Sequence, residues 1–552
     1  MKFAASPQTA TFLSLRTTSL QRTDVRNLAL LLLGFVCLVV VIPPLRSFPI
    51  TDDWTYARSV PRLLDFSYVP DQAAQASALV HIAWGALFAG LFGQSFTVLT
   101  VANLFMGLIG VFLFYLLLRQ LAVTPRYALL GAGLLGLNPI YVYLSYSFMT
   151  DVTFVVCILL GCLCYVKAAQ GYGDRWLWLG SIAAASAYLT RQYGILLVPA
   201  ALLYLWWSRD WLWRKAIAIA AIPTLTVVVY TLFERAQTTT LASIVASDVI
   251  SYIVQHPLAF AVARMQHDSW VMYAVGLLLL PVLKLPRRRL LTLAVFGVLT
   301  LSIVLTSLQY GTVFPPIGNV IDHTGFVMYD YPAATLWGEG IWVVLAVIGA
   351  LSFSIYAVAT GEDVWVWIRS GGLRSRTQNP VLVVYLVGVM LTAVILVITP
   401  YVFDRYALTL LPILLVPELR RLSTGEKRSG IASRVALAVP VALFAVLGQR
   451  DYMAHATVRW QAAEALVAQG VARDKIHAGF EWEEWYLFDE GLSYMQKTGD
   501  YTNAGYAAKA VLDPQYIVSD VPLPQSDEIS SLPYVSWLSG GETRYVRVLK
   551  RR

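Results

Sequence analysis

Two adjacent carboxylates follow the first strongly apolar segment of this chain. Asp52 and Asp53 stand in the stretch "FPITDDWTYA", shortly after the apolar run "LALLLLGFVCLVVVIPPL". The simplest interpretation is a helix cap, in which Thr51 or Asp52 accepts backbone N–H groups and the helix dipole favours Asp53. The functional interpretation is proton abstraction, because a neighbouring carboxylate and partial burial both raise the pKa of a carboxyl group toward a useful value. Adjacent helical positions point about 100° apart, so one of the two acids should matter more than the other.

Further charged residues stand at the ends of other apolar segments. Asp151 lies in "SFMTDVTF", Arg191 lies in "AYLTRQYG", and "FDRYALTLLP" carries an acid, an arginine and a tyrosine at positions 404 to 406. An ionisable residue at membrane depth is a functional candidate, although a carboxylate at a helix start can also be a cap. An arginine in such a place needs an anionic partner, either an aspartate or a phosphate. Asp404 and Arg405 can also simply neutralise each other.

The composition places the elements that carry these residues in a membrane. Of the 552 residues, 58% are hydrophobic and only 13% are charged, about half the charged fraction of a soluble domain. Apolar segments close to the length needed to cross a bilayer recur along the chain. About thirteen spans are predicted by this criterion, at residues 28–46, 97–118, 127–146, 151–170, 176–190, 192–208, 215–232, 270–285, 290–308, 339–359, 380–400, 404–419 and 434–448.

The positive charges predict the orientation of the spans. Lys and Arg cluster in alternate loops rather than in one patch, so the formal charge of +8 indicates membrane topology and not a nucleic-acid partner. If these basic loops are cytoplasmic, the N-terminus is cytoplasmic and an odd number of spans places the C-terminal tail outside. The first span lacks a small-residue cleavage site and is interpreted as a retained anchor. We therefore expect a multi-pass protein of the plasma (inner) membrane, whose outer face carries residues 47–96, 233–269, 309–338 and the tail.

The tail predicts a second, smaller domain. Residues 1–449 form the transmembrane domain with its first outer loop at 47–96, and residues 450–552 have the composition of a small extracytoplasmic α/β domain. A helix over "VRWQAAEALVAQG" is expected to close at Gly470, followed by strands in "KIHAGF", "QYIVSDV" and "RYVRVLK". All four cysteines fall within predicted spans, where Cys162 and Cys164 are interpreted as apolar filling. No nucleotide-binding fingerprint occurs and the histidines lack ligand spacing, so no cofactor is expected and no metal is indicated.

Together these patterns predict acids and arginines at the lipid headgroup level on one face. Asp52, Asp53 and Asp151 could deprotonate a nucleophile arriving from outside, while Arg191 and Arg405 could hold a phosphorylated lipid. A lipid phosphate becomes a good leaving group once arginine meets its charge, so sugar transfer would need a base more than an acid.

Several of these stretches resemble a known family. The stretches "TDDWTYA", "MTDVTF", "YLTRQYG" and "FDRYALTLLPILL" are similar in order and sidedness to parts of the GT-C membrane glycosyltransferases, in the bacterial branch near the protein mannosyltransferases and the lipid A aminoarabinose transferase. The tail stretch "IHAGFEWEEWY" and the outer loop "PIGNVIDHTG" also resemble bacterial members. The resemblance implies a GT-C fold and inverting transfer of a sugar from a polyprenyl-phosphate donor to a glycan, lipid or protein acceptor on the outer face.

The resemblance also implies roles for individual residues. Asp52 corresponds to the first-loop acid that activates the acceptor, Asp53 to the acid after it, and Asp151 to the second acidic position. The donor phosphate would be held by the following three residues: Arg191, which stands where the family usually has lysine, Arg405 and Tyr406. The "KPP" of the aminoarabinose transferases is absent. The weaker candidates are Tyr56, His81, which could replace that phosphate contact, and Asp404.

Two other classes of function stay open at this stage. A transporter or flippase of a lipid-linked glycan would use the same charges to bind cargo without reaction, although neither an internal repeat nor broken helices at the midplane are evident. A membrane-anchored binding protein would depend on residues 450–552 rather than on Asp52. The sequence does not select the sugar or the acceptor.

Overall fold

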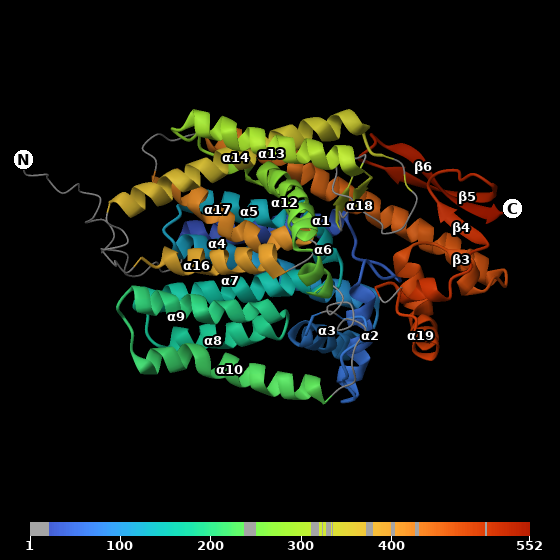
Figure 1. Cartoon of the computed structure of the whole chain (residues 1–552), viewed down its shortest axis with the longest axis horizontal. Helices are drawn as coiled ribbons and strands as arrows, with labels where there is room; N and C mark the ends of the chain where they lie inside the picture. The colour runs from blue at the N-terminus through green and yellow to red at the C-terminus, as the bar shows by residue number, and fades with distance from the viewer. Residues whose placement is uncertain are drawn as a thin grey trace, which may run out of the picture.

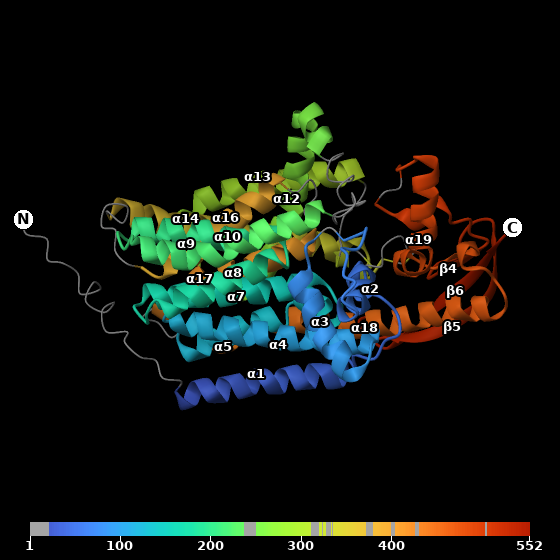
Figure 2. The same cartoon turned by 90° about the horizontal axis from the view of Figure 1, so that it is seen from below.

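The chain consists of a helical body and a small α/β unit at its C-terminal end (Figure 1). The computed structural model describes residues 21–74, 76–236, 250–310, 320–322, 324–326, 333, 335–370, 379–398, 403–424, 430–502 and 505–552. The predicted outer-loop stretch "PIGNVIDHTG" lies only partly within these residues, because positions 316–319 and 323 are not among them. Most helices of the body run side by side, and α18 extends from the body into the C-terminal unit (Figure 2).

The helical body contains the following elements in chain order: α1 (Arg22–Val41), α2 (Asp53–Leu64), α3 (Leu79–Phe92), α4 (Phe96–Gln120), α5 (Pro125–Gly136), α6 (Pro139–Tyr146), α7 (Thr150–Ala169), α8 (Arg175–Tyr188), η2 (Gln192–Leu196), α9 (Leu197–Trp207), α10 (Trp213–Arg235), α12 (Pro257–Leu279), η3 (Leu280–Val282), α13 (Arg289–Tyr310), α14 (Glu339–Arg369), α16 (Val381–Ile398), η4 (Asp404–Tyr406), α17 (Ala407–Thr424) and α18 (Ile431–Ala468). A two-stranded ribbon, β1 (Ile321–Asp322) with β2 (Gly325–Phe326), lies between α13 and α14.

The predicted multi-pass membrane architecture is confirmed, but the count of about thirteen spans is not. In the described part of the chain, seven helices are long and apolar enough to cross a membrane, namely α1, α4, α7, α10, α13, α14 and α18. The pair α5 and α6, bent by 56°, makes an eighth if it is one span. The helix α3, the η2–α9 segment and α16 are apolar but shorter.

Two helix breaks place polar residues within the helical body. The predicted span 127–146 is broken between α5 and α6, where Pro139 cannot donate a backbone hydrogen bond and the Asn138 side chain caps the N–H groups of Ile140 and Tyr141 at 2.9 and 3.2 Å. The junction of the predicted spans 176–190 and 192–208 is also a break, because Arg191 is extended, with φ −148°, between α8 and η2. Because of these breaks, Arg191 and the residues just before α7 are not held in helical geometry.

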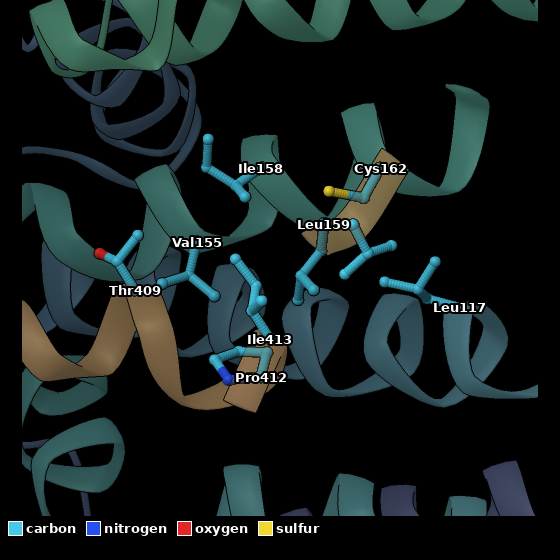
Figure 3. A pocket seen from close by; sticks show the side chains of 9 residues that line it. Leu117, Val155, Ile158, Leu159, Cys162, Thr409, Pro412 and Ile413 are labelled. Carbon is cyan, nitrogen blue, oxygen red and sulfur yellow. The ribbon is translucent and has the colours of Figure 1, made fainter. Parts of the chain in front are cut away.

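The packing between the helices is close. A gap of only about 10 Å³ lies between α4, α7 and α17, and Figure 3 shows the side chains that line it. Cys162 points into this apolar layer beside Leu159 and is 1% exposed. A gap of this size scarcely admits one water molecule. The thiol therefore belongs to the apolar packing, as the sequence predicts.

The basic connections between helices are linked at one end of the body. The Thr124 N–H between α4 and α5 donates to Ser423 Oγ at 3.1 Å, and Arg421 pairs with Asp363 at 2.5 Å. Glu362 of α14 accepts the backbone N–H groups of Arg287 and Arg288, which directly precede α13, at 3.0 and 2.7 Å. This grouping agrees with the alternate basic loops of the sequence, and their cytoplasmic location stays a prediction.

The C-terminal unit combines α18, α19 (Phe480–Thr498) and a four-stranded sheet of order β3-β4-β6-β5. The strands β3 (Ile476–His477), β4 (Tyr516–Ser519) and β6 (Glu542–Arg551) fall in the three predicted stretches. Only β3 and β4 pair in parallel; β6 is antiparallel to both neighbours. The remaining strand, β5 (Ser526–Ser536), was not predicted because its polar start, "SDEISS", lacks a strand pattern. Gly470 follows α18 with φ +90°, and the expected boundary at 449/450 falls within this helix.

The C-terminal unit holds the start of α2. Trp54 packs against Phe488 of α19 at 5.0 Å between ring centroids, within an apolar cluster built mostly from residues after 480. Beside it, Arg58 of α2 pairs with Asp489 at 2.6 Å. The first loop is therefore fixed from both sides, by the helical body and by α19.

Candidate functional site

Four charged side chains from four separate elements meet as two ion pairs. Arg191 Nη2 lies 2.7 Å from Asp151 Oδ2, and Arg405 Nη1 lies 3.3 Å from Asp52 Oδ2. The Tyr406 ring joins the pairs, because its centroid is 5.9 Å from the Arg191 guanidinium carbon and 5.7 Å from that of Arg405. The sequence prediction that these residues converge is therefore matched by the geometry.

Tyr56 lies within the electrostatic field of all four charged groups. Burial, assisted by Asp52 and Asp151 and opposed by both arginines, raises the pKa of the Tyr56 hydroxyl to about 12. The phenol is therefore neutral and can donate a hydrogen bond at neutral pH. Its ring meets the His81 ring edge-on at 5.9 Å, which connects the site to α3.

In the Arg191–Asp151 pair, the guanidinium donors already have partners. Arg191 donates from Nε to Thr150 Oγ1 at 3.0 Å and from Nη1 to Tyr193 Oη at 3.1 Å. Burial by itself lowers the pKa of Arg191, but the Asp151 carboxylate and the nearby tyrosines raise it above its usual value. Asp151 is 3% exposed. This pair supplies a fixed positive group whose charge is already largely balanced.

The Asp52–Arg405 pair is more exposed to solvent and has fewer hydrogen-bond partners. The Asp52 side chain is 38% exposed, whereas that of Arg405 is 9% exposed. Arg405 Nε is buried and has no hydrogen-bond partner among the described residues. A buried donor without a partner costs about 1–3 kcal/mol, so this arginine is suited to receive an additional anion.

Asp53 faces away from this pair and into the protein. Its side chain is 0% exposed and pairs with Arg46, also 0% exposed, at 2.6 Å. It also accepts the backbone N–H groups of Ile50 at 2.8 Å and Phe148 at 2.9 Å. Burial raises the pKa of Asp53, and Arg46 and these N–H groups oppose that shift. The geometry favours a structural role for Asp53 and leaves Asp52 as the accessible carboxylate.

Two of the weaker candidates are engaged in local structure. The Asp404 carboxylate accepts the N–H groups of Val320, Ile321 and Arg405 at 3.1, 2.8 and 2.7 Å, and so ties the ribbon to η4. His81 is fully buried, with Nδ1 2.8 Å from Thr153 Oγ1 and Nε2 3.1 Å from the Phe148 carbonyl oxygen. Burial lowers the pKa of His81 to about 4. A neutral histidine with both nitrogens engaged is poorly suited to hold a phosphate.

The C-terminal unit contributes acids that the sequence did not single out. Glu481 of α19 lies 3.4 Å from the Thr51 backbone nitrogen, and Glu484 accepts the Ala508 N–H at 2.9 Å. Burial, together with the Glu483 and Asp52 carboxylates, raises the pKa of Glu484 to about 8. A usable signal was present, because three acids in the aromatic stretch "FEWEEWY" cannot all face solvent. Arg46 gave no such signal, since it ends an apolar span where basic residues are common.

Replacement of Glu484 by Gln tests this pKa directly. Because the folded-state pKa lies above the usual value of 4.5, the folded protein binds more protons than the unfolded chain between pH 4.5 and about 8. The stability contributed by Glu484 is complete below pH 4.5 and is lost as pH rises through 8. Glu484→Gln should therefore melt above wild type at pH 8.5 and close to it at pH 5, as measured by thermal unfolding in detergent. An equal difference at both values would contradict the assigned shift.

The donor set of the site consists of carboxylates, guanidinium groups and phenols. Among the residues that the structure describes, no group of three His, Cys, Asp or Glu side chains is arranged to hold a metal ion. Within this set, Asp52 offers an accessible carboxylate and Arg405 a buried donor that has no partner among the described residues. Groups of these types can transfer a proton and bind an anion.

One family model matches part of the chain. Residues 77–233 match the family described as dolichyl-phosphate-mannose-protein mannosyltransferase. The matched segment includes Asp151 and Arg191, begins after Asp52 and ends before Arg405. Among curated proteins, none matches the sequence.

Solved structures that resemble the chain do so at low identity. The S. cerevisiae protein O-mannosyltransferase Pmt1-Pmt2 complex bound to the sugar donor is 17% identical over 42% of this chain, with a TM-score of 0.35, and the chain spans only 36% of that protein. ArnT from Cupriavidus metallidurans bound to undecaprenyl phosphate is 14% identical, covering 95% of this chain and 97% of ArnT, with a TM-score of 0.39. The Archaeoglobus fulgidus oligosaccharyltransferase AglB, in complex with an inhibitory peptide and a dolichol-phosphate, is 12% identical, covering 90% of this chain and 69% of AglB, with a TM-score of 0.42.

The family match is the comparison that bears on identity. It covers less than a third of the chain, over the helices from α3 to α10. The resemblance to membrane glycosyltransferases that the sequence predicts is therefore confirmed, through residues 77–233, as a resemblance to the protein mannosyltransferase family.

Proposed function

We propose that this protein is an integral membrane glycosyltransferase that transfers a sugar from a polyprenyl-phosphate donor to an acceptor on the outer face of the membrane. The observation that carries the proposal is the open Asp52–Arg405 pair, an accessible carboxylate beside a buried guanidinium with an unused donor. The match of residues 77–233 to a family named for dolichyl-phosphate-mannose supports a lipid-phosphate donor. The sugar and the acceptor, whether glycan, lipid or protein, are not selected by the site.

The reaction is a single displacement. The acceptor hydroxyl oxygen forms a bond to the anomeric carbon of the sugar while the bond from that carbon to the donor phosphate oxygen breaks. The acceptor proton passes to Asp52, and polyprenyl phosphate leaves with its charge balanced by Arg405 and Arg191. One displacement inverts the anomeric configuration. Tyr56 and Tyr406 line the same site.

The ion pair suggests how donor binding prepares the base. Arg405 lies against Asp52 at 3.3 Å. A phosphate that binds the Arg405 guanidinium, including its buried Nε, competes with Asp52 for that arginine. The Asp52 carboxylate is then released from the ion pair and can face the acceptor. The base is then available only when the leaving group is in place, which limits unproductive proton transfer.

Replacement of Arg405 by Lys should weaken donor binding. Lysine keeps the charge but loses the planar set of donors that can hold phosphate and Asp52 together. Loss of one charge-assisted hydrogen bond corresponds to an increase of about 10- to 100-fold in the KM for the donor. The matched control is Arg450→Lys, because Arg450 packs on Trp537 at 4.0 Å in the C-terminal unit. An unchanged KM in Arg405→Lys would exclude its role in donor binding.

The function itself is tested with purified protein in lipid and a labelled polyprenyl-phosphate sugar. Release of free polyprenyl phosphate together with a labelled acceptor establishes transfer. A flippase would instead move the intact donor between leaflets without releasing lipid phosphate. A binding protein that works through its tail would keep its function in Asp52→Asn.

A further inference from the structure

The backbone immediately before Asp52 is held in an unusual conformation. Thr51 has φ +50°, in the left-handed region that a β-branched residue rarely adopts. Its side chain is 6% exposed, and its hydroxyl has no hydrogen-bond partner among the described residues. The side chain therefore does not offset the steric cost of the conformation. Strain of this kind persists only where the surroundings impose it, and it clusters at functional sites.

Two buried carboxylates contact the backbone at this point, one from each side. The Ile50 N–H donates to Asp53 Oδ1 at 2.8 Å, and Asp53 is fixed in turn by Arg46 at 2.6 Å. The next N–H along the chain, that of Thr51, points to Glu481 Oε1 at 3.4 Å. Consecutive N–H groups are thus directed to acids from two different parts of the protein.

Glu481 belongs to the C-terminal unit and is itself fixed. Its second carboxylate oxygen pairs with Arg459 of α18 at 3.0 Å, and both side chains are 0% exposed. An aromatic layer surrounds the pair, because Trp460 packs against Phe48 at 5.9 Å and against Trp482 at 4.9 Å. A carboxylate embedded in this way has little freedom to follow Thr51 if the loop moves.

We infer that Glu481 is a positioning residue, through which the C-terminal unit holds Thr51 in its left-handed conformation and so aims Asp52 at Arg405 and the acceptor. The inference rests on the proposed function for its catalytic consequence. It gives the C-terminal unit a part in the site that does not require it to touch either substrate. If Thr51 relaxes to negative φ, the Asp52 side chain leaves its place, and a displacement of about 1 Å can lower a rate about 100-fold.

The test removes the contact of Glu481 with the Thr51 N–H without leaving an unpaired buried charge. The double variant Glu481→Leu with Arg459→Met replaces the ion pair by apolar groups of similar size, a change that folded proteins often tolerate. We expect kcat to fall about 100-fold, with a smaller change in the KM for the donor. Adding Thr51→Gly should recover at least about tenfold in kcat, because glycine adopts positive φ without steric cost. Recovery by a change in backbone preference is not expected if Glu481 serves only general stability.

A second measurement does not depend on activity. Carbodiimide with an amine nucleophile modifies accessible carboxylates, and mass spectrometry gives the rate at Asp52. We expect the double variant to change this rate severalfold and Thr51→Gly to restore it. The matched control is Glu464→Gln, because Glu464 accepts the Tyr486 hydroxyl at 2.7 Å within the same unit; both readouts should stay at wild-type values. If the double variant does not fold, the double variant Glu481→Met with Arg459→Gln, which also leaves neither buried charge, is measured with and without Thr51→Gly in the same way.

The outcomes separate the two claims. If the wild type transfers no sugar but the labelling of Asp52 changes and is restored as described, the proposed function fails and the positioning role stands. If transfer occurs and a folded Glu481 variant keeps wild-type kcat and labelling, the positioning role is overturned. It is also overturned if Thr51→Gly recovers neither quantity.

Discussion

The variant Asp52→Asn should lower kcat for sugar transfer about 10²- to 10⁴-fold, the usual contribution of a general base. Asparagine keeps the shape of the side chain but cannot accept the acceptor proton. The KM for the donor should change much less, because Arg191 and Arg405 remain. Asp52 is 38% exposed and its ion pair is long, at 3.3 Å. An ion pair of this kind contributes only about 0–1 kcal/mol, so the unfolding temperature should stay close to that of wild type.

The matched control is Asp489→Asn. Asp489 also pairs with an arginine near the first loop, Arg58 at 2.6 Å, but it is 74% exposed. Turnover of this control should equal that of wild type when release of polyprenyl phosphate is followed in the same lipid. Equal release from wild type and Asp52→Asn would remove Asp52 from the mechanism, whatever the control shows.

The membrane class and the convergence of charges could be predicted from the sequence because both depend on local patterns. Apolar runs identify spans, and an acid or arginine at the end of a run stands out against them. Asp52, Asp151, Arg191 and Arg405 were found in this way, and the ion pairs join them across up to 353 residues of sequence. The patterns could not supply the number of spans, because α8, α9 and α16 are short and α5 and α6 are bent apart.

The sequence does not predict that Asp52 is accessible and Asp53 is buried, since this difference depends on partners distant in the sequence. Asp53 is occupied by the Phe148 N–H, 95 residues away, and by Arg46, which looks like an ordinary basic residue at the end of a span. Glu481 was missed for the same reason, because its importance comes from Thr51, 430 residues earlier. Left-handed backbone at a threonine has no signature in the sequence at all, since nothing in the local pattern "PITDD" requires it.

The variant Asp53→Asn should have the opposite profile to Asp52→Asn, a large loss of stability. Both members of the Arg46–Asp53 pair are 0% exposed. Removing one partner of a buried pair leaves an uncompensated charge and costs about 3–5 kcal/mol. Asparagine also replaces one of the two oxygens that accept the Ile50 and Phe148 N–H groups by an amide NH2, which is a donor. We expect a lower unfolding temperature in detergent and a lower yield of folded protein.

A second substitution separates stability from catalysis. Adding Arg46→Met to Asp53→Asn removes the unpaired charge, so most of the lost stability should return. If Asp53 acts only by holding Ile50 and α2, the double variant should regain turnover in proportion to the folded fraction. If Asp53→Asn instead melts like wild type and loses turnover as strongly as Asp52→Asn, Asp53 is the base. The two adjacent carboxylates would then have to exchange roles, which the closed contacts of Asp53 with Arg46 and Phe148 oppose.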